Sequence, residues 1–237
     1  MDVLGVGKLP FMARRNFVYE FIHLLPWSVL AGVVEGQFAS VVVSKTFHGS
    51  TLLIAVAAGM PYAAYISSLF WGMLCVGRPK IQLSILAGVG TAIFAALAGM
   101  LPTPANGAVI FITQIALAQI FLAGVVTVRA AILKANYPPA IRGQIAARLQ
   151  GIRSVISILA VQSAAALCDW RPEAYRLVYP GAALLGLLGV TLLSRVRIRG
   201  QRAELRSSER ARAEGNIAAN IQAFSMADLF SPAHAWK

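Results

Sequence analysis

Polar side chains that can carry or bind a charge interrupt the long apolar stretch Phe17–Val43. They are Glu20, His23, Glu35 and Gln37. A carboxylate or an imidazole is costly in lipid, so such a group normally faces a protein interior or a water-filled cavity. The stretch is also long enough to cross a bilayer, which takes about 20 apolar residues. The sequence therefore predicts a membrane span that carries polar and titratable side chains away from lipid.

Glu35 is the strongest candidate for a functional role among these side chains. It lies roughly 21 Å along a helix from Phe21, at about 1.5 Å per residue, which places it beyond easy reach of the nearer membrane surface. One interpretation is that Glu35 faces a central cavity and binds a proton, a cation or a substrate amine. The other is that Glu35 stabilises a packed helix contact beside Gly32 and Gly36.

Glu20 and His23 are three residues apart, so they share a helix face with Trp27 one turn further on. An ion pair with an aromatic belt at the membrane interface and a proton relay are both compatible with this spacing. Two arginines, Arg148 and Arg153, interrupt a later apolar stretch and need acidic partners. Glu20 is the acid nearest to their level, so we predict that it pairs with one of them.

Arg129 stands about one turn from the end of another apolar stretch. It either extends to the membrane surface or lines a cavity. Gln114 and Gln119 lie earlier in the same stretch as neutral hydrogen-bonding groups. Together with Glu35 and Gln37, these three residues form the predicted pathway for a substrate or an ion.

The composition indicates an integral membrane protein. Of 237 residues, 58% are hydrophobic and 13% are charged, and the mean hydropathy is +0.69; soluble domains carry about 25% charged residues. The net charge of +12 does not indicate nucleic acid, because the basic residues lie in short links and one tail. We find no catalytic constellation, nucleotide-binding loop or metal-ligand cluster, so we predict neither an enzyme nor a cofactor.

Six apolar stretches predict an all-α bundle of six transmembrane helices. Their bounds are Phe17–Val43, Thr51–Leu74, Ile81–Leu101, Val109–Leu133, Ile145–Leu167 and Val178–Val196. None alternates as a barrel strand does, which favours helices. We thus divide the chain into a lead (1–16), a membrane domain (17–196) and a basic tail (197–237). In the tail, the spacing of Ile217, Ile221 and Phe224 predicts a short amphipathic helix.

Lysine and arginine gather on one side of this topology. That side receives Lys8, Arg14, Arg15, Arg78, Lys80, Lys134, Arg142 and the cluster that starts at Arg195, whereas the other receives Lys45, Arg171 and Arg176. Because cytoplasmic links carry the excess of basic residues, both termini are expected in the cytoplasm. The protein is then expected in an inner or plasma membrane.

Small residues recur every fourth position in three of the spans. The second span carries Ala55, Gly59, Ala63 and Ser67, and the third carries Gly88, Ala92 and Ala96; in the first the set is Gly32, Gly36 and Ser40. Residues four apart share a helix face, and small side chains allow helices to approach closely in lipid. We therefore expect these three faces to be helix contacts.

Two of the links carry short motifs. The link after the second span holds Gly72, Leu74, Gly77, Arg78 and Lys80, and the link after the fourth span holds Pro138, Arg142 and Gly143. Their order and placement resemble the loop signatures of the amino-terminal half of major facilitator superfamily transporters. Arg129 is similar to an arginine that many members carry in the fourth span. The family's loop aspartate is absent, and Val76 stands nearest its position.

The resemblance implies a six-helix half of a secondary transporter that moves a small solute by alternating access, with proton coupling as one option. Such a half needs a second six-helix half, either another copy or another chain. The alternative is a non-transporting structural or assembly subunit that keeps the fold. Partners on either interpretation are the lipid bilayer and further helices, not nucleic acid.

Overall fold

The computed structural model describes residues 11–35, 37–100 and 106–213. Its helical segments are α1 (Phe11–Glu35), α2 (Phe38–Lys45), α3 (Thr51–Tyr65), α4 (Ser68–Cys75), α5 (Lys80–Met100), α6 (Gly107–Asn136), α7 (Pro139–Trp170), the short η2 (Pro172–Ala174), α8 (Tyr175–Leu193) and α9 (Gln201–Ala213). The described part of the chain contains no strand, so the all-α prediction is confirmed for it.

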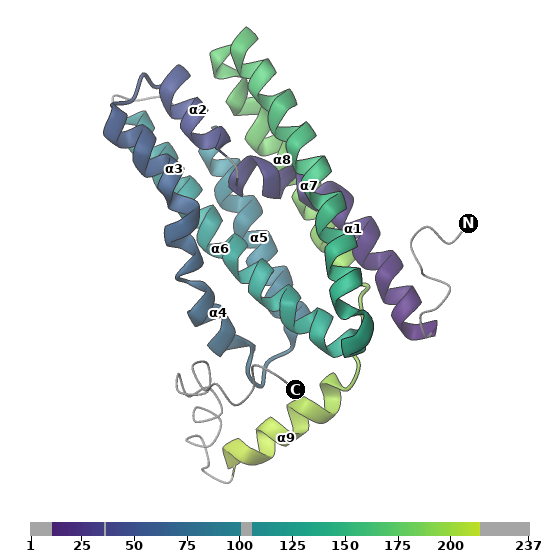
Figure 1. Ribbon diagram of the computed structural model, residues 1–237. Coiled ribbons are helices and arrows are strands. Elements are labelled where there is room, and N and C mark those ends of the chain that lie inside the picture. The colour runs from purple at the N-terminus through teal and green to yellow at the C-terminus, as the bar shows by residue number, and fades with distance from the viewer. Residues whose placement is uncertain (1–10, 36, 101–105, 214–237) are drawn as a thin grey trace, which may run out of the picture.

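Six helical stretches are long and apolar enough to cross a membrane, as the sequence predicts, and they indicate a multi-pass membrane protein. They are Ala13–Glu35, Thr51–Cys75, Lys80–Met100, Gly107–Asn136, Pro139–Trp170 and Pro172–Leu193. Figure 1 shows these helices side by side in one bundle, with α9 beyond the end at which α4, α6 and the start of α1 lie. The predicted amphipathic segment around Ile217 and the first ten residues lie outside the described residues.

The first predicted span is wrong at its far end. We expected one helix over Phe17–Val43, but α1 ends at Glu35 and α2 starts again at Phe38. A helix interrupted at membrane depth needs partners for its free backbone groups. Gln119 supplies one, because its Nε2 donates to the Val34 carbonyl at 2.9 Å.

The second predicted span is also divided. The chain turns at Ile66 and Ser67 between α3 and α4. The Ser67 hydroxyl donates to the Ala64 carbonyl at 2.6 Å, and the backbone N–H of Ser67 reaches the same oxygen at 3.0 Å. These local bonds compete with the regular helical ladder, which accounts for a turn that the apolar composition did not reveal.

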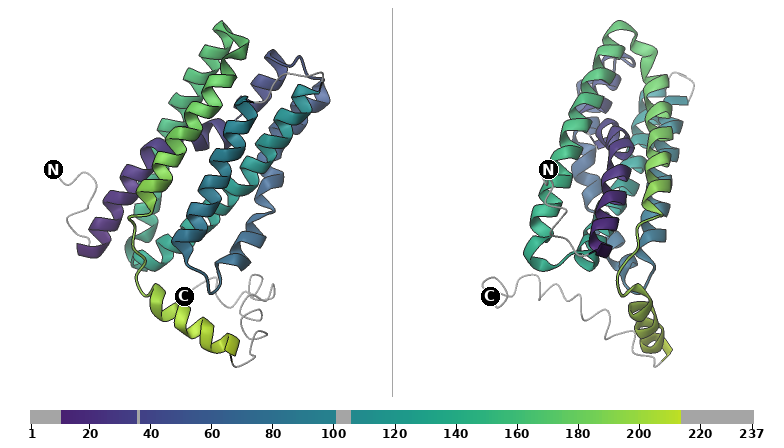
Figure 2. Two further views of the ribbon diagram at one scale, coloured as in Figure 1. Left: turned by 180° about the vertical axis from the view of Figure 1, so that it is seen from behind. Right: turned by 90° about the vertical axis from the view of Figure 1, so that its right-hand side faces the viewer.

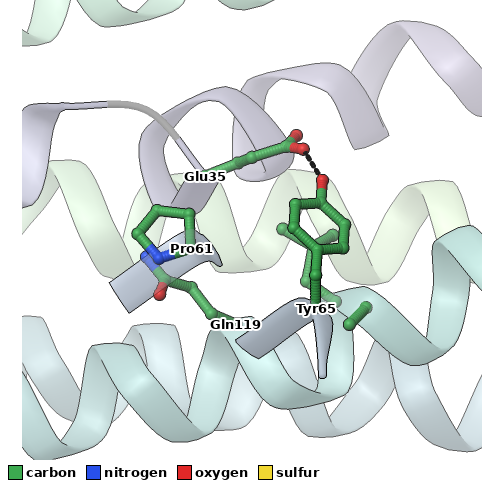
Figure 3. Close-up of a pocket in the computed structure, with 6 residues that line it drawn as sticks. Glu35, Pro61, Tyr65 and Gln119 are labelled. Atoms are coloured by element: carbon green, nitrogen blue, oxygen red, sulfur yellow. Dashed lines mark hydrogen bonds between the residues drawn. The ribbon is translucent and has the colours of Figure 1, made fainter. Parts of the chain in front are cut away.

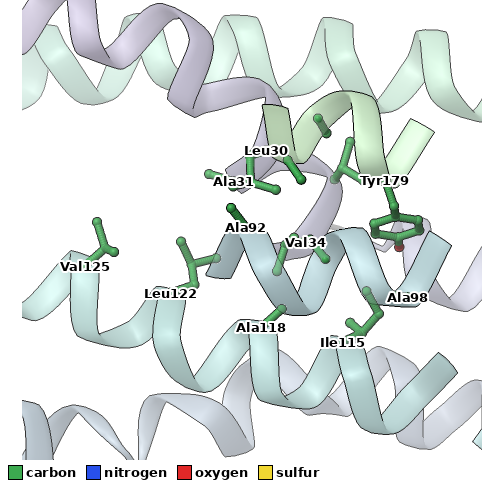
Figure 4. Close-up of a cluster of buried hydrophobic side chains, with 14 of the residues drawn as sticks. Leu30, Ala31, Val34, Ala92, Ala98, Ile115, Ala118, Leu122, Val125 and Tyr179 are labelled. Atoms are coloured by element: carbon green, nitrogen blue, oxygen red, sulfur yellow. The ribbon is translucent and has the colours of Figure 1, made fainter. Parts of the chain in front are cut away.

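The bundle core lies where α1, α5, α6 and α8 meet. Figure 4 shows side chains from these helices interdigitating, among them Leu30, Ala92, Ile115 and Tyr179. Helix α8 approaches α1 closely because Gly186 has no side chain: a Cβ there would lie 2.2 Å from Leu30 Cδ2. These four helices therefore form the packed centre of the protein.

Two spans are peripheral. Only 11% of the apolar window is buried in each of Thr51–Cys75 and Pro139–Trp170, against 39–61% in the other four. Helices α3 and α4 pack mainly on α6 and α2, whereas α7 packs mainly on α1. The two views of Figure 2 show that α7 and the α3–α4 pair border the bundle rather than fill it. Each peripheral span therefore has a long face with no partner among the described residues.

The small-residue faces behave differently from one another. The third-span prediction is confirmed, since Gly88 and Ala92 are buried and a Cβ on Gly88 would lie 2.5 Å from Val190 Cγ2. The second-span prediction is wrong within this chain, because Ala55, Gly59 and Ala63 are exposed. Ala57 and Ala64 are buried there instead. In the first span Gly32 abuts Ser157, whereas Gly36 lies outside the described residues.

Candidate functional site

A cleft opens between α6 and α7, with α1 at its floor. Its volume is about 390 Å³, within the range of about 300–1,000 Å³ typical of small-molecule sites. The residues that line it are Trp27, Val125, Val126, Arg129, Ala130, Leu133, Ala146, Ala147, Leu149, Gln150 and Arg153. Three of these, Arg129, Gln150 and Arg153, supply polar side chains. The cleft is thus an apolar groove with a few polar groups.

Arg129 is one of the two charged groups on the cleft wall. Its electrostatic neighbours are Glu20, Arg153 and Tyr137. The structure gives its guanidinium no hydrogen bond to any described residue. A guanidinium has five N–H donors. Arg129 therefore brings a positive charge and open donors to the cleft wall, which favours the cavity interpretation over the membrane surface.

Buried polar groups on α1 lie behind Arg129. Glu20 is only 2% exposed and His23 only 1%. Tyr137 donates its hydroxyl hydrogen to Glu20 Oε1 at 3.2 Å. His23 Nδ1 lies 2.8 Å from the Gly189 carbonyl and, because a carbonyl only accepts, Nδ1 carries the proton. His23 also stacks on Trp27, with ring centroids 5.8 Å apart, so the shared face predicted for them is present.

Two atoms of this buried group lack a hydrogen bond among the described residues. They are Glu20 Oε2 and His23 Nε2. A buried polar atom without a hydrogen-bond partner is costly, so each such atom in a folded protein needs an explanation. Both side chains interact electrostatically with Arg129.

Tyr137 lies just beyond α6, where burial and then the charge of Glu20 raise the pKa of Tyr137 well above its ordinary value.

A second charged group, which we call the Glu35 junction, joins α1, α3 and α7. Glu35 Oε1 accepts a hydrogen bond from the Tyr65 hydroxyl, and Glu35 Oε2 accepts one from Arg153 Nη2. Figure 3 shows Tyr65 turned toward the carboxylate, with Pro61 and Gln119 beside it. The pocket at this point holds only about 10 Å³. Both carboxylate oxygens are therefore occupied.

The junction also explains how a carboxylate is tolerated at the end of α1. A helix C-terminus carries a partial negative charge, so an acidic side chain there is unfavourable. The guanidinium of Arg153 and the hydroxyl of Tyr65 offset this charge. The predicted pairing of Arg153 with Glu20 is wrong, because α7 packs along α1 at a level that places Arg153 against Glu35. Arg148 is exposed on α7, and its pairing with Glu20 stays a prediction.

The residues predicted to form a pathway do not converge on one site. Arg129 lines the cleft, whereas Glu35 and Gln119 border the small pocket of the junction. Gln37 is exposed just before α2, and its carbonyl accepts from the Ser40 hydroxyl at 2.7 Å. Gln114 precedes Arg129 by 15 positions on α6, which separates their backbones by roughly 22 Å.

Sequence reasoning missed Gln150 and Tyr65 as site residues. Gln150 and Arg153 are three residues apart, so they share a helix face, and this spacing could have placed Gln150 in the same site as Arg153. Tyr65 had no comparable signal, because its partner Glu35 lies 30 residues away in the sequence.

The loop motifs occupy the predicted links. Gly72 and Leu74 lie in α4, and Lys80 begins α5. Between them, Gly77 adopts φ 65°, a left-handed conformation that favours glycine and precedes Arg78. In the other link, Pro138 precedes α7, with Gly143 exposed in its first turns.

Arg142 in that second link closes the end of α6. Its Nη2 donates to the carbonyls of Lys134 and Tyr137 at 3.0 and 3.1 Å. A cation at a helix C-terminus is favourable, because the last carbonyls there are unpaired and the helix dipole is negative. The part of this motif for which the structure gives contacts therefore has a structural role.

Searches against protein-family models, curated proteins and solved structures find no match for this chain. The class that the fold defines is a helical multi-pass membrane protein with six candidate spans. Within the described residues, no group of three or more His, Cys, Asp or Glu side chains could hold a metal ion.

Proposed function

We propose that the chain is one six-helix half of a secondary transporter, similar to the amino-terminal half of the major facilitator superfamily, and that it moves a small solute by alternating access. The observation that carries this proposal is the cleft between α6 and α7, with Arg129 on its wall. Arg129 is the pathway residue predicted from the sequence that lines a cleft large enough for a small solute.

The unpartnered faces of the peripheral helices support the need for a second half. The cleft is bordered by α7, and α3 and α4 lie on the other side of α6. The exposed small residues Ala55, Gly59 and Ala63 would allow a further helix to approach α3 closely. A second six-helix half, from another copy or another chain, would pack on the unpartnered faces of α3 and α7 and close the cleft.

The distribution of charge supports a cytoplasmic location for both termini in an inner or plasma membrane. The start of α1, the α4–α5 link, the α6–α7 link and the chain after α8 lie at the same end of the bundle (Figure 1). These segments carry Arg14, Arg15, Arg78, Lys80, Lys134, Arg142, Arg195, Arg197 and Arg199. An excess of basic residues marks the cytoplasmic side.

A structural or assembly subunit is the second candidate, and the Glu35 junction favours it. Both oxygens of Glu35 are occupied within the chain, as expected of a group that holds helices together rather than one that binds a solute. The two candidates differ in what they require of the cleft. A transporter needs it open to water on each side in turn, whereas a structural subunit needs it filled.

Cysteine accessibility tests this difference. We would replace Cys75 and Cys168 with serine, introduce Ala130→Cys in the cleft, and apply a membrane-impermeant thiol reagent to inside-out and right-side-out vesicles. Alternating access predicts modification from both sides. Ile93→Cys, on the exposed face of α5, is the matched control and should stay unmodified in lipid. No modification of Ala130→Cys from either side would reject the transporter and leave the structural subunit.

A further inference from the structure

The walls of the cleft come from a part of the chain that has no acidic residue. No Asp or Glu occurs between Glu35 and Asp169, a region that contains all of α6 and all but the last turn of α7. The same two helices carry Arg129 and Arg153 into the cleft. The cleft wall therefore presents positive side chains without negative ones.

The nearby acids on α1 do not line the cleft. Glu35 is saturated by Tyr65 and Arg153. Glu20 is buried behind Arg129, and its Oε1 accepts from Tyr137. These two are the titratable acids that face the arginines from the packed helices, and neither of them lines the open volume. A ligand in the cleft would therefore meet the arginines directly.

Open hydrogen-bond donors accompany these charges. Arg129 makes no hydrogen bond to a described residue, and Arg153 uses Nη2 for Glu35. Because each guanidinium carries five N–H groups in a planar fork, donors remain on both. Gln150 adds a neutral amide on the same wall. Forked arginine donors match the oxygen pair of a carboxylate or phosphate.

The rest of the lining is apolar. Val125, Val126, Leu133 and Leu149 surround the arginines, and the Trp27 ring contributes to the floor. A ligand that matches this surface has a charged end and an apolar or aromatic body. A small inorganic anion would leave most of the volume of about 390 Å³ unfilled.

We propose that this cleft binds an anionic group, carboxylate or phosphate, attached to an apolar or aromatic body, with Arg129 and Arg153 as the residues that hold the anion. This inference rests on the proposed function and names the solute class for that transporter. The anion is carried either by a dissolved solute or by a lipid headgroup, and the experiment distinguishes these sources.

Three probes of nearly the same shape test the charge preference: benzoate, neutral benzamide and cationic benzamidine. Binding of each is measured on the full chain in phosphatidylcholine nanodiscs, with binding to empty nanodiscs subtracted. We expect benzoate to bind about tenfold more tightly than benzamide, as charge-assisted bonds to a guanidinium require, and benzamidine to bind most weakly. Equal affinities for benzoate and benzamide, or tighter binding of benzamidine, would overturn the proposal.

Variants assign the preference to the cleft. Arg129→Gln should reduce the ratio of benzoate affinity to benzamide affinity by about tenfold. The control is Arg148→Gln, which lies on the same helix as Arg153 but outside the cleft lining and should leave this affinity ratio unchanged. If Arg129→Gln does not fold, Arg129→Lys is measured instead. It keeps the charge and loses the fork, so benzoate should weaken about threefold with benzamide unaffected. An unchanged ratio in the folded variant contradicts the proposal.

The lipid arm repeats the benzoate measurement in nanodiscs that contain phosphatidylglycerol. A strong loss of benzoate affinity means that a lipid phosphate occupies the anion site, and an unchanged affinity means that the site takes dissolved anions. The proposed anion site and the proposed transport function can be rejected independently. Access to Ala130→Cys from both sides without anion preference rejects only the inference, whereas anion preference with access from neither side rejects only the transporter.

Discussion

The cleft at Arg129 and the Glu35 junction are both charged regions inside an apolar bundle, and they differ in how the charge is satisfied. At the junction, each carboxylate oxygen receives a donor from a different helix, and about 10 Å³ of space remains. At the cleft, the guanidinium of Arg129 has no hydrogen-bond acceptor among the described residues and faces about 390 Å³. Arg153 belongs to both regions.

This difference assigns the two regions different roles, one in stability and the other in ligand binding. When an ion pair is satisfied within the protein, removing one partner is destabilising because the other charge is left uncompensated. A charged group that has no hydrogen bond within the protein and borders an open volume keeps donors available to a ligand. Glu35, which looks the more functional of the two in the sequence, is therefore assigned to structure, and Arg129 to the proposed site.

The largest expected effect is on stability at the junction. Glu35→Ala leaves Arg153 without its acid, and we expect the free energy of unfolding to fall by about 3 kcal/mol, the lower limit for a buried pair, because Glu35 is 30% exposed. The measurement is detergent-induced unfolding in mixed micelles. The exposed pair between Lys45 and Asp169 is the matched control, and Asp169→Ala should cost less than about 1 kcal/mol. Equal losses would remove the distinction between the two pairs.

Tyr65→Phe is a milder test of the same junction. It removes one hydrogen bond to Glu35 and keeps the ring, so the free energy of unfolding should fall by about 1 kcal/mol. Tyr62→Phe, three residues earlier on α3 and 74% exposed, should change it by less than about 0.5 kcal/mol. A loss at Tyr62 as large as at Tyr65 would show that the hydroxyl bond to Glu35 is not what stabilises α3.

Arg129→Gln tests the other side of the comparison. Arg129 makes no hydrogen bond to a described residue, but it is a counter-charge of the buried Glu20. The variant should therefore lower the free energy of unfolding by less than Glu35→Ala does, while it removes the anion preference of the cleft. The same micelle titration gives the stability. A loss as large as that of Glu35→Ala would place Arg129 with the structural charges.

The smallest expected effect is a pH dependence behind the cleft. Burial, together with Glu20, raises the pKa of Tyr137 above its ordinary value of 10.0. Above that pH the unfolded chain loses the phenol proton while the folded protein keeps it. Stability from this group is therefore present below pH 10 and falls by about 0.8 kcal/mol at pH 10.5. Tyr137→Phe should reduce the stability lost between pH 8 and pH 10.5 by this amount; an identical loss in both proteins would contradict it.

Much of the fold could be predicted from the sequence, because the length and polarity of each apolar run decide whether it can span a bilayer. The predicted end at Leu74 lies one residue from the end of α4. The faces of the spans could not be predicted in the same way. Lipid and protein interior are both apolar, so composition does not say whether Ala55 and Gly59 or Ala57 and Ala64 face the bundle.

The candidate site was predictable only residue by residue. Arg129 stood out as a charge within a span, and it lines the cleft. The partners of Glu35 could not be predicted, because they come from α3 and α7, 30 and 118 positions away in the sequence. The end of α1 was missed for the same reason, since Gln119 reaches Val34 from 85 residues away.

The central claim is that the cleft, rather than the Glu35 junction, is open to a dissolved ligand. In a protein with Cys75 and Cys168 replaced by serine, we would compare the rates at which a membrane-impermeant thiol reagent modifies Ala130→Cys in the cleft and Ala123→Cys in the pocket beside Glu35. We predict that Ala130→Cys reacts about tenfold faster or more, because Ala130 is exposed whereas Ala123 is 3% exposed. Equal rates, or faster modification of Ala123→Cys, would contradict the account.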